Sequence, residues 1–421
     1  MYSNHVSDAQ FFKQSTALAC SLPILVLCLL ILSLSSCSTI EPSDVSVEKV
    51  QPPILTLQGQ WLVDQQGQIL VDPQPSGLTL YDDKLVMISD ASADDSQVKQ
   101  LHFIDPNTGM RHTTTGQYVL TETVAAGCFA QYLQTKPDLE ALIRDPQHPN
   151  GFITVTEDAS VLGKLTPACQ LQYKATGSTQ YPTVLVRLLW DNNVLSVTGV
   201  RAVQFPTDAL VGNSPNDGIE GLSIVDRTLY LALEKDANYR ARIFSTLITD
   251  DFWQRDEFVR VSDTAWQLPD FFAGRTTDKR EPHPINGTDI VTYQDTTWLV
   301  AAARNDNQLW LVDTAQIKAT KVVKLAYLAP NYLRQSKLQP DELSTSTNKQ
   351  CALNTVMHNA SLEGVAVDDQ TVYLVNDPWK VNYWKNIQCE NTRPWYATMM
   401  GGLLFTVSVE QLFLHARDIG T

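Results

Sequence analysis

The hydrophobic and polar positions of this chain repeat in a short pattern that is typical of β-hairpins. Within residues 216–236, an apolar run from Leu222 to Val225 is followed by the polar pair Asp226-Arg227 and by a second apolar run from Leu229 to Leu233. Both runs are rich in residues that favour strands, and a short polar pair between such runs is typical of a tight turn. The pattern therefore predicts two antiparallel strands joined by a tight turn.

The same hairpin pattern recurs along the chain. Glu220-Gly221 begins this hairpin, and Glu363-Gly364 stands at the same place in residues 362–377. Further copies cover residues 76–90, 140–158 and 289–302. Repetition of one supersecondary unit indicates a repeat fold, and each of these units is β.

Additional β-prone runs follow the hairpins, which predicts four antiparallel strands in each repeat. These runs are residues 100–104 and 118–121, 183–190 and 194–205, 241–248 and 257–261, 308–312 and 321–328, and 402–407. The last repeat has one run fewer, and the N-terminal run 55–63 can supply its missing outer strand. Four-stranded units repeated around an axis form a β-propeller. The expected fold class is an all-β propeller of five blades closed by the N-terminal strand, and a sixth blade could lie in residues 122–182.

The first 36 residues are expected to be a lipoprotein signal peptide. An apolar run from Thr16 ends in Leu34-Ser35-Ser36-Cys37, which resembles the bacterial lipobox. That resemblance implies that Cys37 is lipidated, and Ser38 after it favours the outer membrane. Residues 37–53 are then a polar tether. The alternative is an uncleaved signal anchor.

Composition and charge narrow the class of protein. A chain of 421 residues with 43% hydrophobic and 18% charged residues is typical of a folded globular protein. Its formal net charge of −15 argues against a nucleic-acid-binding protein, which needs a basic face. The expected partners are the membrane, through the lipid on Cys37, and a small-molecule ligand or an envelope protein. The propeller is expected to cover residues 54–410, followed by a C-terminal tail, 411–421.

Four cysteines follow Cys37, and none of them forms a CxxC motif. In an oxidising compartment we expect the pairs Cys128–Cys169 and Cys351–Cys389, because each pair lies within or beside one repeat. Each disulfide would contribute about 3–4 kcal/mol to stability in the chain-entropy description. The alternative is that these residues are buried free thiols.

Acidic residues stand at equivalent positions of the repeats. In a propeller the start of each inner strand and the end of its antiparallel partner lie at the same face, so equivalent positions form rings around the channel. One ring consists of Ser76, Glu140, Glu220, Thr288 and Glu363, and the other of Asp90, Glu157, Glu234 and Asp377, with Arg304 near its fourth position. Converging carboxylates repel one another unless a cation neutralises them or some remain protonated. Several hard oxygen ligands suit Ca²⁺ better than a transition metal.

The sequence therefore predicts a Ca²⁺ site at the channel mouth. The expected ligands are Glu220, Glu363, Asp289, Glu140, Glu234 and Asp377. The alternative is that each glutamate accepts hydrogen bonds from backbone N–H groups of the next blade.

Other candidate residues surround the same mouth. His283 and His358 precede two of the hairpins and could act as a general base or contact a phosphate; exposed loop histidines are the alternative. Lys235, Arg240 and Arg304 are the basic residues that we expect to bind an anionic substrate.

The repeated hairpin also resembles a known family, the exported propellers labelled esterase-like activity of phytase, and more broadly the phytase-like and lactonase-like six-bladed propellers. The residues that carry the resemblance are Glu220-Gly221-Leu222 with Tyr230-Leu231 and Glu234, and Glu363-Gly364-Val365 with Tyr373-Leu374 and Asp377. The resemblance implies a Ca²⁺-dependent hydrolase of phosphoester or ester bonds.

Two functions remain open. The first is a lipid-anchored envelope propeller that binds a ligand or partner at an acidic, Ca²⁺-loaded channel mouth. The second is the hydrolase that the resemblance implies. No GxSxG, HExxH, GxGxxG or Walker motif is present in the sequence, which favours the first. The acidic rings at the channel mouth favour the second.

Overall fold

The computed structural model describes residues 53–157, 165–173, 182–209, 211, 218–269, 284–333, 351–358 and 360–419. The expected signal peptide, the lipidation site Cys37, nearly all of the tether and His283 lie outside these residues. Among the helices that the structure describes, none is both long enough and apolar enough to span a membrane.

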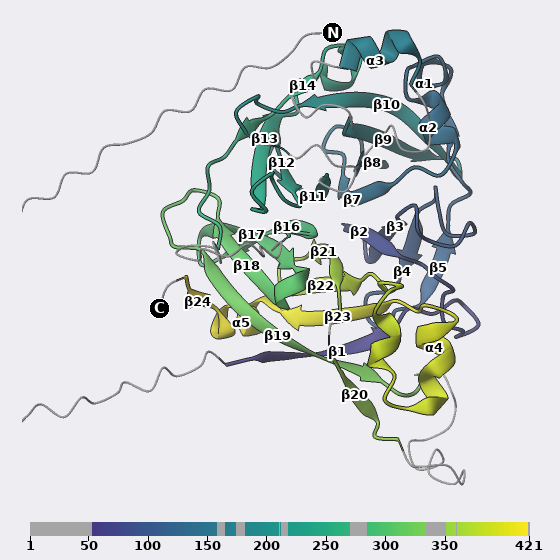
Figure 1. Cartoon of the computed structure of the whole chain (residues 1–421), viewed down its shortest axis with the longest axis vertical. Helices are drawn as coiled ribbons and strands as arrows, with labels where there is room; N and C mark the ends of the chain where they lie inside the picture. The colour runs from purple at the N-terminus through teal and green to yellow at the C-terminus, as the bar shows by residue number, and fades with distance from the viewer. Residues whose placement is uncertain are drawn as a thin grey trace, which may run out of the picture. The chain divides into compact units, whose positions relative to one another are not determined.

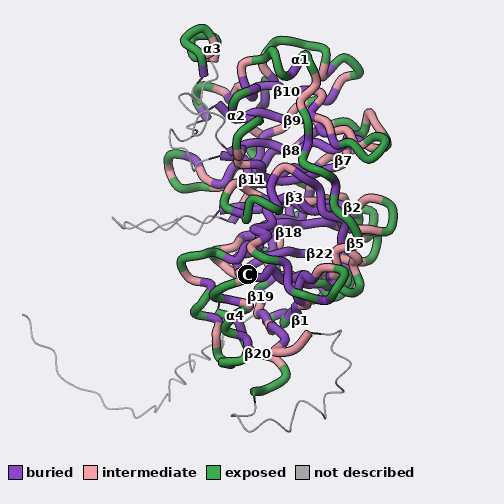
Figure 2. The backbone as a smooth tube through the Cα atoms, turned by 90° about the vertical axis from the view of Figure 1, so that its right-hand side faces the viewer, coloured by how far each residue is buried: buried purple, intermediate pink, exposed green. Residues whose placement is uncertain are grey.

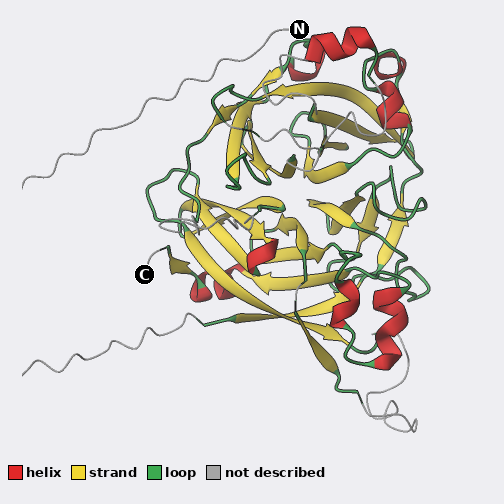
Figure 3. Ribbon diagram, viewed as in Figure 1, coloured by secondary structure: helices red, strands yellow, loops and turns green. Residues whose placement is uncertain are grey.

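The described strands form five successive antiparallel meanders, each of which begins with one of the predicted hairpins (Figures 1 and 3). The first contains β2 (Pro75–Tyr81), β3 (Lys84–Ser89), β4 (His102–Ile104) and β5 (Arg111–Thr114). The second contains β7 (Leu139–Arg144), β8 (Gly151–Thr156), β9 (Val184–Asp191) and β10 (Val194–Gln204). The third contains β11 (Ile219–Val225), β12 (Thr228–Leu233), β13 (Arg242–Leu247) and β15 (Ser262–Asp263). The fourth contains β16 (Gly287–Tyr293), β17 (Thr296–Ala303), β18 (Gln308–Asp313) and β19 (Lys321–Pro330). The fifth contains β21 (Leu362–Val367), β22 (Thr371–Asn376) and β23 (Leu403–Ser408).

The first strand of each meander lies at the centre. β2 contacts β7, β7 contacts β11, β11 contacts β16, β16 contacts β21, and β21 contacts β2. Figure 1 shows these inner strands gathered in the middle, with β5, β10, β13 and β19 farther out. Meanders arranged radially around their first strands have the architecture of a β-propeller.

Burial follows the position of a strand within its meander. All six residues of β8 are buried, whereas none of the four residues of the outer strand β5 is. Figure 2 shows the same contrast between buried strands and exposed connecting loops. The hydrophobic core therefore lies between neighbouring meanders. Burial of apolar side chains in this core holds the inner strands together.

The N-terminal strand β1 (Leu55–Trp61) pairs with two different meanders. Residues 55–58 run parallel to β19, and residues 59–61 run antiparallel to β23. The sequence predicts only the second pairing. Because β1 bridges the fourth and fifth meanders, they form one ten-stranded sheet together with β20 (Asn354–Met357) and β24 (Arg417–Asp418).

Two of the predicted outer strands pair differently from the expectation. Within residues 118–121, β6 (Val119–Leu120) pairs in parallel with β10 of the second meander, and β5 is the outer strand of the first. Within residues 257–261, β14 (Val259–Arg260) likewise pairs with β10, while β15 pairs with β13. Strands of two to four residues carry too little apolar pattern to specify a partner, so neighbouring structure decides their pairing.

The described α-helices lie at the periphery (Figure 3). They are α1 (Glu122–Ala125), α2 (Ala130–Gln134), α3 (Pro167–Tyr173), α4 (Arg393–Ala397) and α5 (Val409–His415). The described 3₁₀ turns are η1 (Phe252–Gln254), η2 (Arg304–Asp306), η4 (Tyr383–Asn386) and η5 (Glu390–Thr392), and η2 lies among the strands. The described part of residues 122–182 thus contains α1 to α3 and the hairpin β7–β8. The expected tail contains the end of α5 and β24, which pairs with β19.

Both predicted disulfides are confirmed. Cys128 is bonded to Cys169 and Cys351 to Cys389, each with a Cα–Cα distance of 5.7 Å. The first connects the α1–α2 region to α3, and the second connects the residue segment before β20 to the segment before α4. Both therefore fix the longer connections at the edge of the propeller.

Candidate acidic metal site

Bulges in the inner strands give the acidic residues their direction. The pairing register shifts between Ile219 and Gly221 and again between Leu362 and Gly364, so that Glu220 and Glu363 are each the extra residue of a bulge. The register of β7 also shifts after Glu140. A bulge interrupts the alternation of side chains and redirects the extra one. Three glutamates are thereby set apart from the packed faces of their sheets.

The glycines beside these glutamates allow the inner strands to approach closely. A Cβ atom on Gly364 would lie 2.5 Å from Val375 Cγ2 and 2.9 Å from Leu78 Cβ. A Cβ atom on Gly287 would lie 1.8 Å from the carbonyl oxygen of Glu363. Only glycine fits at such a separation, so the recurrence of glycine after the glutamate has a packing cause.

Carboxylates from three meanders come together. Glu140, Glu220 and Glu363 each offer an oxygen within 4.8 Å of the other two, and so do Glu157, Glu220 and Glu234. Asp138, Glu140 and Glu157 form a third such group. We call these six residues, Asp138, Glu140, Glu157, Glu220, Glu234 and Glu363, the acidic cluster. All except the partly exposed Asp138 are buried.

Burial and mutual repulsion disfavour full ionisation of the acidic cluster. Burial, followed by the charge of Glu234, raises the pKa of Glu220 to about 8, and Arg304 opposes the shift. Burial, followed by the charge of Glu220, also raises the pKa of Glu140 and of Glu157 well above the usual value of a glutamate. The cluster therefore retains protons at neutral pH unless a cation replaces them.

Two basic side chains contact the acidic cluster. Arg304, on η2, pairs with Glu363 through Nη1, and its Nη2 lies 3.3 Å from Glu234 Oε1. Lys235 pairs with Glu234. Glu157 Oε1, by contrast, is buried and has no hydrogen-bond partner among the described residues. Arg304 and Lys235 thus pair with Glu234 and Glu363, and Glu157 Oε1 is left for another ligand.

Two further aspartates border the acidic cluster. Burial, followed by the charge of Asp90, raises the pKa of Asp377 to about 8. Burial, followed by the charge of Asp138, raises the pKa of Asp90 to about 6. Asp377 Oδ1 is also buried without a hydrogen-bond partner among the described residues. Asp377, an expected ligand, is thus a neighbour of the cluster and belongs to none of its three-carboxylate groups.

Asp289, another expected ligand, lies in a different environment. It accepts hydrogen bonds from the N–H groups of Ile290 (2.8 Å) and Val367 (2.7 Å), and it belongs to none of the three-carboxylate groups of the described residues. Burial raises its pKa to about 7. β16 pairs with β17 without a register shift, so it has no bulge to redirect this side chain. Asp289 connects β16 to β21, which is the role that the alternative interpretation gave to the repeated glutamates.

The remaining candidates are distributed around the molecule. His358 is exposed in the loop after β20 and lines a small pocket of about 220 Å³ together with Trp379 and Asn382. The backbone N–H of Arg240 donates to Asp236 Oδ1 at 3.0 Å. Of the three expected substrate-binding residues, the structure brings Lys235 and Arg304 to the acidic cluster.

Asp138 is a member of the acidic cluster that the repeat pattern does not predict. It lies directly before β7 and two residues before Glu140, and residues two apart in a strand lie on the same face. The two-residue spacing from Glu140 was the sequence feature from which Asp138 could have been predicted. Its Oδ1 accepts a hydrogen bond of 2.9 Å from the N–H of Ala91 and so connects the first meander to the second.

Comparisons with known proteins add a distant structural likeness. No protein-family model matches the sequence, and no curated protein matches it either. Among solved structures, the chain is similar to a GH43_1 enzyme from Xanthomonas citri, at 8% identity and a TM-score of 0.37, over 83% of this chain and 90% of that one. It is also similar to the β-propeller domain of Cps50 (Swd1) from Myceliophteria thermophila, at 8% identity and a TM-score of 0.28, over 79% and 82% of the two chains. A Bacteroides fragilis protein described as exported has 10% identity and a TM-score of 0.32, over 84% and 94%. Because each TM-score is below 0.5, the assignment of the fold depends on the strand order of this chain.

Proposed function

We propose that this protein is a bacterial envelope propeller of five blades, closed by β1 and anchored through a lipid on Cys37, that binds Ca²⁺ at the acidic cluster. The observation that carries the proposal is the meeting of Glu140, Glu220 and Glu363 within 4.8 Å. Each comes from a different meander, and each lies where its inner strand departs from regular pairing.

A divalent cation explains why so many carboxylates share a buried space. Ionised carboxylates at this separation repel one another strongly when they are shielded from water. Ca²⁺ takes six to eight oxygen ligands in flexible geometries, and carboxylates are the commonest of them. Glu140, Glu220 and Glu363 supply one set of oxygens, and Glu157, whose Oε1 has no hydrogen-bond partner among the described residues, adds another.

The two basic residues beside the cluster indicate what such a cation could bind. Arg304 and Lys235 lie on the side of Glu234 and Glu363, and each keeps part of its side chain exposed. A carboxylate or phosphate of a ligand could contact the cation and these side chains together. The proposed ligand is therefore a small anionic molecule or an acidic segment of an envelope partner.

The same arrangement favours a second candidate function. Ca²⁺ next to a guanidinium group can polarise and stabilise a phosphoester or ester during hydrolysis. Assays of a generic phosphoester and a generic ester, each with Ca²⁺ and with chelator, address this candidate. Activity at background level in all four assays would rule it out and leave the binding function standing.

Isothermal titration of the full chain with Ca²⁺ tests the proposed site. Glu220 belongs to two of the three-carboxylate groups, so we expect Glu220→Gln to weaken Ca²⁺ binding at least about tenfold, the size of effect typical of altered metal sites. Glu257 is exposed and outside the cluster, which makes Glu257→Gln the matched control with unchanged binding. If wild-type protein gives no heat at millimolar Ca²⁺, or if both variants bind like wild type, the proposal fails.

A further inference from the structure

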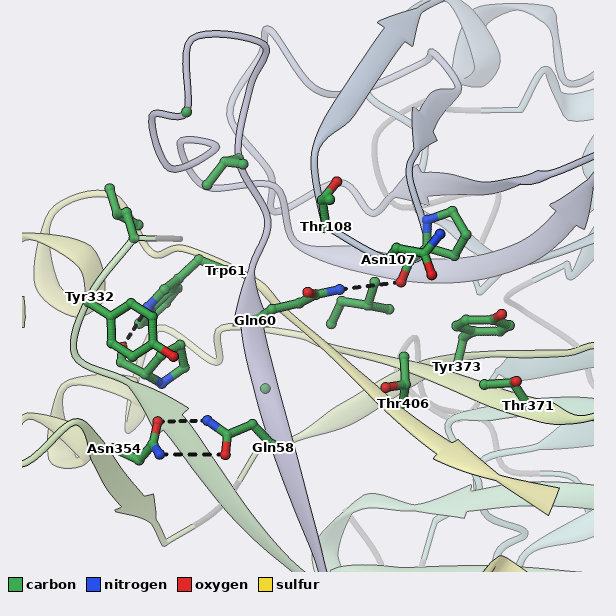
Figure 4. Close-up of a pocket in the computed structure, with 17 residues that line it drawn as sticks. Gln58, Gln60, Trp61, Asn107, Thr108, Tyr332, Asn354, Thr371, Tyr373 and Thr406 are labelled. Atoms are coloured by element: carbon green, nitrogen blue, oxygen red, sulfur yellow. Dashed lines mark hydrogen bonds between the residues drawn. The ribbon is translucent and has the colours of Figure 1, made fainter. Parts of the chain in front are cut away.

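A cleft of about 730 Å³ lies on the fifth meander and shares no residue with the acidic cluster. Its floor is formed by β1, β22 and β23. Pro106 to Thr108, in the turn between β4 and β5, form one wall, and Tyr332, which follows β19, stands opposite with Asn354 of β20. Figure 4 shows Gln60 in the middle of this cleft, between Asn107 and Thr108 on one side and Tyr332 on the other.

The cleft exists because β1 changes its pairing partner. β1 pairs with β19 as far as Gln58 and with β23 from Gly59 onward. After Gln58, β1 no longer pairs with β19, and the lining of the cleft includes Gly59, Gln60 and Trp61. The indole N–H of Trp61 donates to the carbonyl oxygen of Pro330 at 2.8 Å and holds the wall beside Tyr332 in place.

The lining of the cleft is polar but uncharged. The chain contains 46 acidic and 31 basic residues, yet the described residues that line the cleft include no Asp, Glu, Lys, Arg or His. Carboxamides and hydroxyls line it instead: Gln58, Gln60, Asn107, Asn354, Thr371 and Thr406. A charged ligand would lose its hydration in this cleft without gaining a counter-charge, so the lining selects a neutral one.

Hydrogen bonds hold several of these carboxamides in position. Gln58 and Asn354 exchange side-chain hydrogen bonds at 2.6 and 3.5 Å, and Gln60 Nε2 donates to Pro106 O at 3.3 Å (Figure 4). A carboxamide has two N–H donors and two lone pairs. The Gln58–Asn354 pair therefore retains donors and acceptors for a ligand after making its own bonds.

We infer that this cleft binds a neutral oligosaccharide. Sugar hydroxyls both donate and accept hydrogen bonds, which is also the capacity of carboxamides and threonine hydroxyls. The ring of Tyr332 supplies an apolar face with a polar tip, and the C–H face of a sugar ring can pack against such a surface. The volume lies within the usual range of small-ligand sites, about 300–1,000 Å³.

An array of neutral oligosaccharides, built from glucose, galactose, mannose, xylose and N-acetylglucosamine units, tests the inference with the full chain. We expect at least one glycan to bind and to give a measurable Kd by isothermal titration. Gln60→Leu and Thr406→Val should each weaken that binding at least tenfold. Gln411→Leu changes an exposed glutamine of α5 outside the cleft and should bind like wild type.

Thr406→Val keeps the shape of the side chain and removes only its hydroxyl, so it remains informative if Gln60→Leu perturbs folding. Thermal unfolding of each variant separates the two effects. No glycan bound on the array, equal affinity in wild type and Thr406→Val, or preferential binding of a neutral extended peptide would overturn the inference. Because the cleft contains none of the acidic cluster, this result is independent of whether Ca²⁺ binds there.

Discussion

Glu220 shows how one side chain can connect proton and metal chemistry. Its bulge directs it toward carboxylates of two other meanders, and burial together with Glu234 raises its pKa to about 8. Metal ligands must be deprotonated, so metal binding at such a group releases a proton. Ca²⁺ binding to this protein at pH 7 is therefore expected to be accompanied by proton release.

Arg304 competes with a cation for the same carboxylates. Arg304→Gln removes the charge that pairs with Glu234 and Glu363, whose side chains are only 6–7% exposed while that of Arg304 is 27% exposed. Loss of one partner of a buried pair costs about 3–5 kcal/mol, and the partial exposure of Arg304 reduces the expected loss to about 1–3 kcal/mol in chelator. We expect the same variant to bind Ca²⁺ several-fold more tightly, since a nearby positive charge is gone.

Urea unfolding in chelator and Ca²⁺ titration measure the two effects. Arg255→Gln is the control, because Arg255 pairs with Asp251 at the exposed surface, where such pairs contribute about 0–1 kcal/mol. Weaker Ca²⁺ binding by Arg304→Gln would contradict the placement of the cation beside these carboxylates.

The candidate metal ligands could be predicted from the sequence only in those copies of the hairpin that keep the repeated pattern. Glu140, Glu220 and Glu363 were identified from their offsets before the hairpins, and the structure brings all three together. Asp289 was expected as a further ligand although Thr288 stands at the equivalent position of the fourth copy, which has no Glu-Gly pair and no bulge, so the Asp289 side chain follows a different course. A bulge depends on the pairing of two strands, and the offset alone does not reveal it.

At the scale of elements, the inner strands are held at separations that exclude side chains. Gly287 of β16 lies against the backbone of β21 at Glu363. Its position thus affects both the packing of two meanders and the placement of one proposed ligand.

Gly287→Ala is expected to lower the free energy of unfolding by about 3 kcal/mol or more, because overpacking typically costs 1–3 kcal/mol and here the clash is with backbone. Ca²⁺ affinity should fall as well, since Glu363 has to move. Gly116→Ala is the matched control: a Cβ atom there meets nothing within 4 Å. Urea unfolding of both variants makes the comparison, and equal stability would show that the inner strands are farther apart than described.

The hairpins were the predictable elements, and the connections between meanders were not. Tight polar turns between β-prone runs specify strands such as β11 and β12 locally. The polar strand β5 and the two-residue strands β6, β14 and β15 have no comparable signal. The double pairing of β1, and hence the cleft lined by Gln60 and Tyr332, depends on segments hundreds of residues apart that only the folded chain brings together.

At the scale of the whole molecule, the contacts among β2, β7, β11, β16 and β21 bring the acidic ends of separate meanders to one place. This convergence places carboxyl groups in a buried space, where their ionised forms are disfavoured. The pKa of Glu220 and of Asp377 is raised, chiefly by burial, to about 8 in each case, whereas unfolded carboxyls titrate near 4.

Stability should therefore depend on pH and on Ca²⁺ together. Between about pH 4 and pH 8 the folded chain binds more protons at these groups than the unfolded chain, so their contribution to stability decreases as pH rises. In chelator we expect Tm to be higher at pH 5 than at pH 8. Millimolar Ca²⁺ should raise Tm more at pH 8 than at pH 5, because it replaces protons that are then absent.

Thermal scans at several pH values, with Ca²⁺ and with chelator, check this prediction. Glu220→Gln, which cannot titrate at this position, should show a smaller decrease in Tm between pH 5 and pH 8. A Tm in chelator that rises over this range would mean that the buried carboxyls are not protonated as described.

The most direct test of the proposed Ca²⁺ site is an anomalous difference map from crystals of the protein grown with Ca²⁺, compared with crystals grown in chelator. We expect one peak within about 2.3–2.6 Å of carboxylate oxygens of Glu140, Glu220 and Glu363, the usual Ca²⁺–oxygen distance, and no such peak in chelator. An empty acidic cluster in crystals grown with millimolar Ca²⁺ would contradict it.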